Sequence, residues 1–295
     1  MYHLFTRRLT LTCEKLSVRL KSPSIRVSAT SGNLDSFRRM SGRARKDDLY
    51  PHDLRTLLTT ISLLLPESLP KSGAYLLPAA AITALGHPNL LGPLFTDVLA
   101  FSPSKEGSSK EPSSTKISLQ LRDVLLKQWT LIGIPLVVTA VSSLASAEKA
   151  SGIEFPPGLS SKYAKTQSLA PSEAVSARGE KFMRKLYLEN LEPIMSTWGS
   201  HEADFTWLEK SVIYGLFLSD HEVLNEVETE MVIMTSIMVQ NLKAPTLWHV
   251  RGLRRLGISK KDVEEAVKIV IECARYLGHG QKDWVQWVGE VDGEV

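Results

Sequence analysis

The chain has 295 residues, of which 43% are hydrophobic and 23% are charged. These proportions are typical of a globular protein that buries a substantial core, in one large domain or two small ones. Lys and Arg exceed Asp and Glu by only 35 − 32 = 3, so the overall charge argues neither for nor against a nucleic-acid partner. We expect no such partner.

The N-terminal segment has a different composition from the rest. Residues 1–46 contain eleven Lys or Arg and only two acids, Glu14 and Asp35. A segment rich in Arg, Ser and Thr and poor in acids resembles a mitochondrial transit peptide, and it lacks the apolar core of a secretory signal. We therefore expect a mitochondrial protein. The alternatives are an untargeted tail, or an upstream extension with the true start at Met40, which would leave the protein cytoplasmic.

The first half of the chain shows helical periodicity. Apolar residues at helical spacing predict a helix over 53–65, ended by Pro66, and two or three short helices between Gly/Pro corners over 70–101. Residues 102–116 are rich in Ser, Pro, Gly and Lys, which indicates a flexible insertion. A pair of helices is then predicted over 116–148, with a corner at Gly133–Pro135.

An uncharged run, 128–147, lies across that corner and is about as long as a membrane span. Gly133 and Pro135 interrupt it, and a buried helical hairpin would produce the same apolar run. We therefore expect a hairpin and no membrane span.

The second half begins after a Pro/Ser-rich linker, 150–176, and is dense in helix signals. Helices are predicted over 178–198 and 203–218. A capping box of Ser219 and Glu222 is predicted to open a helix that ends near Leu242. Its apolar stripe is expected to be Val223, Val227, Met231, Met234, Met238 and Leu242. A helix from Pro245 to Gly257 and one capped by Ser259 and ended by Gly278 follow.

No segment alternates like a strand, so the predicted class is all-α, a bundle of helical hairpins. Moving the chain by 110 residues places Pro135 on Pro245, Gln120 on Glu230 and Thr139 on His249. We interpret this as two diverged repeats, because repeated helical hairpins are a common architecture. The predicted boundaries are a tail over 1–46, a first repeat over 47–149, a second repeat over 177–282 and a C-terminal tail over 283–295.

The stretch from Glu230 to Gly257 contains the pair of side chains with the clearest chemical potential. Glu230 lies on the first helix and His249 on the second, so they are not level in an ideal hairpin, but helices that cross, or two subunits, could bring them together. A carboxylate beside an imidazole makes a proton carrier near neutral pH. The alternative interpretation is purely structural: His249 is a histidine at the edge of the core, and Glu230 is one acid of an acidic run.

Other site types have weaker support. The chain lacks a phosphate-binding glycine loop, an HExxH zinc motif and a serine nucleophile elbow. Its two cysteines, Cys13 and Cys273, are too few for a disulfide framework or a cysteine zinc site. We expect neither a metal nor an organic cofactor. Trp248 and Arg251 are candidates for substrate binding, although such residues are more often a packing tryptophan and part of a solvated basic face.

The run from Glu230 through His249 to Gly257, followed by Ile258–Glu265, resembles the carboxymuconolactone decarboxylase / alkylhydroperoxidase D (AhpD-like) family. Segments Arg178–Gly179 and Tyr214–Gly215, together with Tyr187, are similar to its two-repeat fungal branch. The resemblance covers about residues 175–280 and implies an AhpD-like bundle, homo-oligomers, and Glu230 and His249 as site residues.

Peroxidatic members of that family carry Cys-x-x-Cys before the histidine, where this chain has Leu242 and Pro245. Peroxide reduction needs the thiol, so a thiol-dependent antioxidant role is disfavoured. The resemblance then implies a lyase-like protein with cofactor-free acid/base chemistry, decarboxylation included, on a small organic acid or lactone. The alternative is a non-catalytic helical oligomer with a structural or assembly role.

Overall fold

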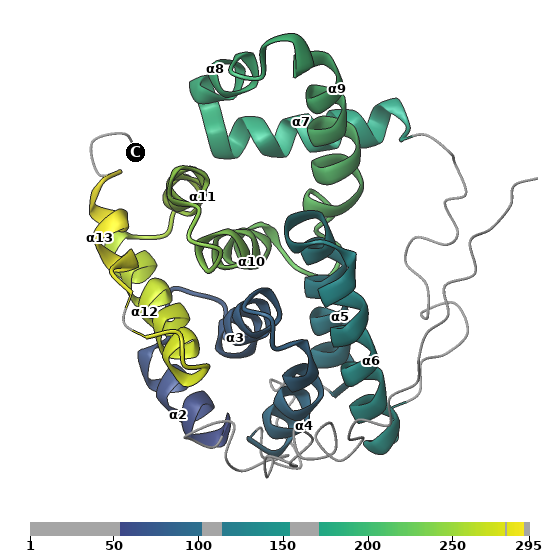
Figure 1. Ribbon diagram of the computed structural model, residues 1–295, viewed down its shortest axis with the longest axis vertical. Helices are drawn as coiled ribbons and strands as arrows, with labels where there is room; N and C mark the ends of the chain where they lie inside the picture. Colours follow the sequence, from purple (N-terminus) through teal and green to yellow (C-terminus); the bar gives the residue numbers. More distant parts are fainter. Residues whose placement is uncertain (1–53, 102–113, 154–170, 281, 292–295) are drawn as a thin grey trace, which may run out of the picture. The chain divides into compact units, whose positions relative to one another are not determined.

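The computed structural model describes residues 54–101, 114–153, 171–280 and 282–291, and every regular element in these ranges is helical (Figure 1). The predicted all-α class is confirmed. These ranges belong to a unit that spans Asp47–Val295. The basic segment Met1–Lys46 is a separate unit and lies outside the described residues, as does the predicted insertion from 102 to 113.

The helices of the first half follow the predicted punctuation. They are α2 (Leu54–Leu64), α3 (Gly73–Ala84), the 3-10 turn η2 (Pro88–Leu90), α4 (Leu91–Phe101), α5 (Ser114–Ile132) and α6 (Ile134–Ala150). The predicted insertion is shorter than expected at its end, because Ser114 to Lys116 form the first turn of α5. Gly133, at φ 83°, makes the corner before α6, as predicted for the uncharged run. Among the helices in the described ranges, none is both long and apolar enough to cross a membrane.

The described part of the second half combines four helices of 13 to 17 residues with several shorter pieces. They are α7 (Glu173–Tyr187), η3 (Leu188–Asn190), α8 (Leu191–Ser196), η4 (Gly199–His201), α9 (Glu202–Trp207), the π-helix η5 (Leu208–Leu218), α10 (Glu226–Met238), α11 (Lys243–Arg255), α12 (Lys260–Tyr276) and α13 (Trp284–Gly289). The expected C-terminal tail therefore begins with a helix. Trp284 and Val288 of α13 are buried in the main core.

The predicted capping box at Ser219 and Glu222 is wrong. The helix begins later, at Asn225, whose side chain accepts a hydrogen bond from the backbone N–H of Glu228. The Glu228 carboxylate accepts one from the backbone N–H of Asn225 in return. Ser219 instead donates its hydroxyl to the carbonyl of Gly215, at the end of the π-helix, so it cannot serve as a cap.

Helix α10 lies between α3, α5 and α11 (Figure 1). All residues from Glu228 to Val239 are buried, so the predicted single stripe is only part of a helix that is buried all round. Of that stripe, Met231, Met234 and Met238 are buried, whereas Leu242 follows the helix and is 46% exposed.

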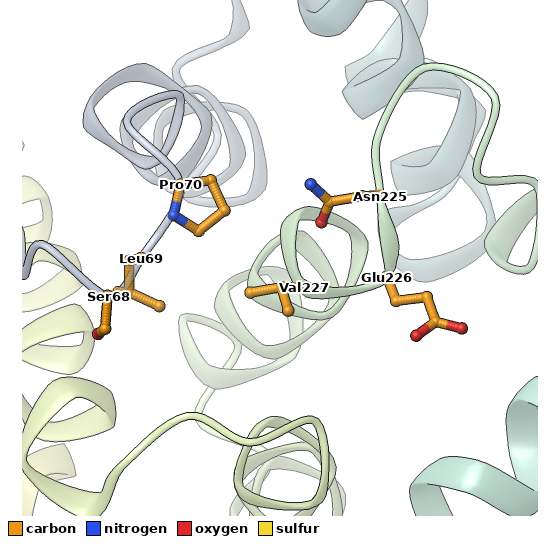
Figure 2. A pocket seen from close by; sticks show the side chains of 6 residues that line it. All are labelled: Ser68, Leu69, Pro70, Asn225, Glu226 and Val227. Carbon is orange, nitrogen blue, oxygen red and sulfur yellow. The ribbon is translucent and has the colours of Figure 1, made fainter.

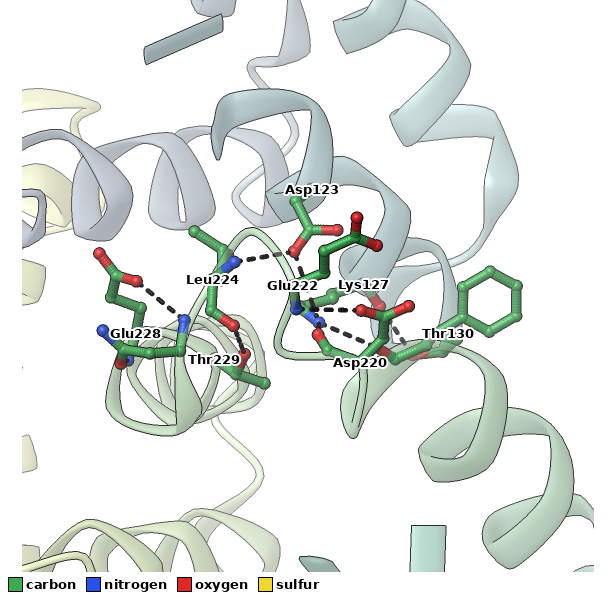
Figure 3. Close-up of polar contacts among 10 residues, drawn as sticks. Asp123, Lys127, Thr130, Asp220, Glu222, Leu224, Glu228 and Thr229 are labelled. Atoms are coloured by element: carbon green, nitrogen blue, oxygen red, sulfur yellow. Dashed lines mark hydrogen bonds and ion pairs between the residues drawn. The ribbon is translucent and has the colours of Figure 1, made fainter. Parts of the chain in front are cut away.

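A buried ion pair on α5 is hydrogen-bonded to the turn before α10 (Figure 3). Lys127 Nζ lies 3.5 Å from Asp123 Oδ2 and donates hydrogen bonds to the carbonyl oxygens of Phe217 and Asp220, at 2.8 and 2.7 Å. Asp123 Oδ2 accepts one from the backbone N–H of Leu224, at 3.4 Å. These partners compensate two charges that are almost fully buried.

The buried side chains form two clusters. The larger one includes α2 to α6, α12, α13 and one side of α10. The smaller one is built mainly from α7, η5 and the other side of α10, and it contains Tyr187, Tyr214 and Ile233. The pair Glu230 and His249 borders this smaller cluster. His249 is hydrogen-bonded to Tyr187, a member of the cluster, and to Glu230.

Candidate functional site

Glu230 and His249 meet directly. Nδ1 of His249, on α11, lies 2.8 Å from Oε1 of Glu230, on α10. Glu230 is fully buried and His249 is 3% exposed. The sequence left open whether the two side chains share a pocket, and in the structure they form a hydrogen bond within one chain. Their assignment as catalytic residues stays a prediction.

A glycine makes this approach possible. Gly252 lies one turn after His249 on the same face of α11, and a Cβ built on it would stand well inside contact distance of Glu230 Oε1. The other carboxylate oxygen, Glu230 Oε2, is buried and has no hydrogen-bond partner among the described residues. The carboxylate is therefore held by the histidine on one side and has capacity for a further donor on the other.

Two tyrosines extend the pair into a chain of polar groups. The hydroxyl of Tyr187, at the end of α7, lies 3.4 Å from Nε2 of His249 and 2.8 Å from the hydroxyl of Tyr214, on η5. Because a carboxylate only accepts, Glu230 fixes the proton on Nδ1, and Nε2 is left as an acceptor. Tyr187 then donates to His249, and Tyr214 donates to Tyr187.

Glycines and an arginine bring α7 and η5 close together. A Cβ on Gly179 would collide with the backbone of Lys210 and Gly215, so only glycine fits there. Arg178 donates to the carbonyl of Gly215 at 2.7 Å. The segments Arg178–Gly179 and Tyr214–Gly215, which supported the family resemblance, thus have a packing role that positions Tyr187 against Tyr214.

Burial controls the protonation of these groups. Desolvation raises the pKa of both tyrosine hydroxyls well above the usual value, so both remain donors at neutral pH. Glu209, in the first turn of η5, interacts electrostatically with His249, Tyr187 and Tyr214. Burial raises the pKa of Glu209 to about 7, and the nearby His249 opposes that rise.

The sequence did not single out Tyr187, Tyr214 or Glu209 as site residues. The two tyrosines were visible only as part of the family resemblance. Glu209 lay in a segment predicted as ordinary helix, and no pattern there marked a π-helix. Their contribution depends on packing between α7, η5 and α11, which a single sequence does not show.

The two predicted substrate-binding residues differ in position. Trp248 is partly buried, and its ring packs edge to face on Tyr187, with centroids 6.3 Å apart. It is therefore a neighbour of the site. Arg251 follows His249 by two positions, about 200° around an α-helix, so it projects from the other side of α11.

The first half of the chain has no equivalent pair. Gln120, the counterpart of Glu230, is buried and hydrogen-bonded to Tyr75 and to Glu228. Thr139, the counterpart of His249, is exposed and donates to Pro135 of its own helix. The two counterparts therefore do not form a second site.

Thiol and metal chemistry find little support in the part of the chain that the structure describes. Cys273 is its free cysteine; it is fully buried, and desolvation raises the pKa of its thiol, which keeps it unreactive. Cys13 lies outside the described residues. No group of three or more His, Cys, Asp or Glu side chains in this part is placed to hold a metal ion.

An open hollow of about 490 Å³ lies elsewhere in the fold (Figure 2). It is lined by the loop between α2 and α3 and by the start of α10: Ser68, Leu69, Pro70, Asn225, Glu226 and Val227. None of these residues belongs to the hydrogen-bonded chain from Glu230 to Tyr214. The hollow therefore gives no direct access to that chain.

Comparison with known proteins gives a distant similarity. No family model matches the chain. The chain is 21% identical to "Peroxisomal protein 2" of Schizosaccharomyces pombe over 173 residues, which are 59% of this chain and 74% of that protein. It is 20% identical to "Peroxisomal protein 2" of Saccharomyces cerevisiae over 186 residues, 58% of this chain and 66% of that protein. The chain is thus a distant relative of fungal proteins of that name, and its AhpD-like assignment stays a prediction.

Proposed function

We propose that the chain is an AhpD-like protein in which His249 and Glu230 carry cofactor-free acid/base chemistry on a small organic acid or lactone, decarboxylation included. The observation that carries the proposal is the buried 2.8 Å hydrogen bond between His249 Nδ1 and Glu230 Oε1. Such a bond fixes the tautomer of the imidazole and stabilises the imidazolium that forms when Nε2 takes a proton.

In a decarboxylation, loss of CO₂ leaves an electron pair on the α-carbon, and one proton must be supplied there. His249, once protonated at Nε2, delivers that proton, and Glu230 stabilises the charge until it is delivered. The unpartnered Glu230 Oε2 is available to a donor group of the substrate. Trp248 stays a proposed substrate contact, because it borders Tyr187. Arg251 was predicted for the same role, but its place on the other side of α11 from His249 gives that role no support.

The test is turnover of a panel of lactone-acids and β-keto acids by the wild-type chain and by His249→Ala. We expect the variant to stay folded and to lose about a hundredfold or more of the rate, as removal of a general acid/base does. The matched control is His201→Ala, which removes an exposed histidine from η4 and is expected to keep full activity. Equal turnover by a folded His249→Ala protein contradicts the proposal.

A second candidate function is a non-catalytic oligomer with an assembly role. A specific observation favours it: α6 exposes Ile134, Val138 and Val141, at 55%, 53% and 46%, along one stripe. An exposed apolar stripe of this kind marks a surface for a partner, here a second copy of the chain. If the whole panel gives no turnover and Val138→Glu reduces the sedimentation coefficient while Thr139→Glu does not, this candidate replaces the first.

The location of the protein in the cell is also a proposal. The composition of residues 1–46 supports mitochondrial import, whereas the name of the two relatives refers to peroxisomes. Fluorescence microscopy of the full chain with a C-terminal tag, compared with a version that starts at Met40, tests both. We expect mitochondrial fluorescence that is lost in the shorter version; peroxisomal fluorescence of both contradicts the targeting prediction.

A further inference from the structure

We propose that Glu209, Tyr214 and Tyr187 form a proton relay between solvent and His249. The use of this relay in turnover rests on the function proposed for His249. The relay itself is a separate statement about how a proton reaches a buried imidazole. It gives a role to Glu209, which no sequence pattern singled out, and to Tyr187 and Tyr214, which the sequence showed only as part of the family resemblance.

The inner part of the relay is a continuous set of hydrogen bonds. The Tyr214 and Tyr187 hydroxyl oxygens are 2.8 Å apart, and Tyr187 Oη is 3.4 Å from His249 Nε2. The longer contact is the weakest connection in the chain. Tyr214 and Tyr187 are only 3% and 8% exposed, and His249 itself is 3% exposed, so the imidazole has little direct contact with water. A phenylalanine would fill the same apolar cluster, whereas the two hydroxyl groups serve the histidine and each other.

The outer part of the relay depends on the π-helix. In an α-helix, residues five positions apart point in directions that differ by about 140°. A π-helix closes its turns at i+5, so Glu209 and Tyr214 of η5 lie one turn apart on the same side. Glu209 therefore stands beside the polar chain, within electrostatic range of Tyr214, Tyr187 and His249.

Exposure gives Glu209 the outer position. Glu230 is fully buried and His249 nearly so, whereas Glu209 is half-buried and contacts solvent. Its neighbour Lys210 pairs with Glu180 of α7, at 3.4 Å. Because burial raises the pKa of Glu209 to about 7, its carboxyl can both hold and release a proton at neutral pH.

In the proposed relay, each group that gives up a proton on one side takes one on the other. The Glu209 carboxyl gives its proton to the Tyr214 oxygen, Tyr214 passes its own proton to Tyr187, and Tyr187 passes its own to His249 Nε2. Both tyrosines end as neutral hydroxyls, Glu209 ends as a carboxylate, and His249 ends as an imidazolium beside Glu230. Solvent then returns a proton to Glu209. In the proposed decarboxylation, this supplies the one proton that each turnover consumes.

The test is the rate at which Nε2 of His249 gains and loses a proton in exchange with solvent, measured by NMR on the full chain labelled in histidine. We expect Glu209→Gln and Tyr187→Phe each to slow the exchange by about tenfold or more, since each breaks the same chain. The double variant is expected to be no slower than either single variant, because both act on one path. The control Glu189→Gln removes an exposed acid from the next turn after α7 and is expected to change nothing.

Unchanged exchange in both single variants, with the His249–Glu230 bond intact, overturns the relay. Unchanged exchange in only one of the two variants also overturns the relay, because a relay stops when any one of its members is removed. If exchange slows as expected but the wild-type chain turns over no lactone-acid or keto acid, the relay stands and the proposed function fails. The relay and the proposed function are therefore tested separately.

Discussion

Gly252 determines how closely α11 approaches α10, because its missing side chain leaves room for the Glu230 carboxylate. His249 and Gly252 are one helical turn apart, so the imidazole and the empty position face the same partner. A carboxylate that is fully buried must be hydrogen-bonded or it is strongly destabilising. The glycine thus supports both the stability of the fold and the geometry of the candidate site.

We predict that Gly252→Ala destabilises the protein by about 1–3 kcal/mol, as overpacking at a buried contact does, and displaces Glu230 from His249. Urea unfolding measures the loss. Gly289→Ala is the control, because a Cβ there meets only Lys260 Nζ at 3.9 Å. A Gly252→Ala protein as stable as the control would show that the two helices do not approach as described.

Glu209 should make the stability depend on pH. Its pKa is raised from 4.5 in the unfolded chain to about 7 in the fold, so the folded state holds one more proton between these values. The contribution of Glu209 to the free energy of unfolding is therefore most favourable below about pH 4.5 and is lost as the pH rises through 7. We predict that Glu209→Gln removes about 2 kcal/mol of this decrease, after allowance for solvent screening. Urea unfolding at pH 5 and pH 8 measures it, and parallel curves for the two proteins contradict it.

Among the residues of the candidate site, the sequence singled out Glu230 and His249 but not those around them. The pair stood out because an acid and an imidazole flank one Pro-bearing corner. Tyr187 and Tyr214 were noted only as part of the family resemblance, and no sequence pattern drew attention to Glu209. Only the three-dimensional packing of α7 on η5 shows that all three surround the same imidazole.

At the scale of elements, α10 and η5 carry the departures from the predicted pattern. The predicted cap at Ser219 failed because two Ser/Asn-to-Glu pairs lie close together, and spacing alone does not separate them. Asn225 with Glu228 has the reciprocal geometry. The helix over 203–218 was predicted correctly as helix, but its change from α to π at Leu208 has no periodic signature.

We predict that Asn225→Ala costs about 1 kcal/mol of stability, as loss of an N-cap usually does. Glu222→Ala, at the mispredicted position, should stay within about 0.5 kcal/mol of the wild type, because Glu222 is exposed and lies outside the helix. Thermal unfolding of both variants distinguishes the two caps. A larger loss for Glu222→Ala than for Asn225→Ala would support the earlier cap.

At the scale of the whole described fold, the two halves of the chain are joined by polar contacts as well as by the apolar core. Lys127 and Asp123 of α5 bind the carbonyls and the N–H of the segment from Phe217 to Leu224 (Figure 3). The all-α class could be predicted from the helical spacing of apolar residues. Most helix boundaries could be predicted because Pro or Gly lies at nearly every turn. The buried ion pair could not be predicted, because charged residues on a helix usually indicate an exposed face.

We predict that Lys127→Met destabilises the protein by about 3–5 kcal/mol, because it removes one partner of a buried pair. The double variant Asp123→Leu with Lys127→Met should recover much of that loss, since no charge then remains buried. Urea unfolding of the single and double variants measures the difference. A single variant with wild-type stability would contradict the burial of this pair.

The most direct test of the proton-transfer site is the incorporation of deuterium from D₂O into the product of a lactone-acid or keto acid that the wild-type chain turns over. We expect one deuterium at the former α-carbon in the product of the wild-type chain and of His201→Ala, and little product from His249→Ala. A folded His249→Ala protein that forms the same deuterated product at the same rate would contradict it.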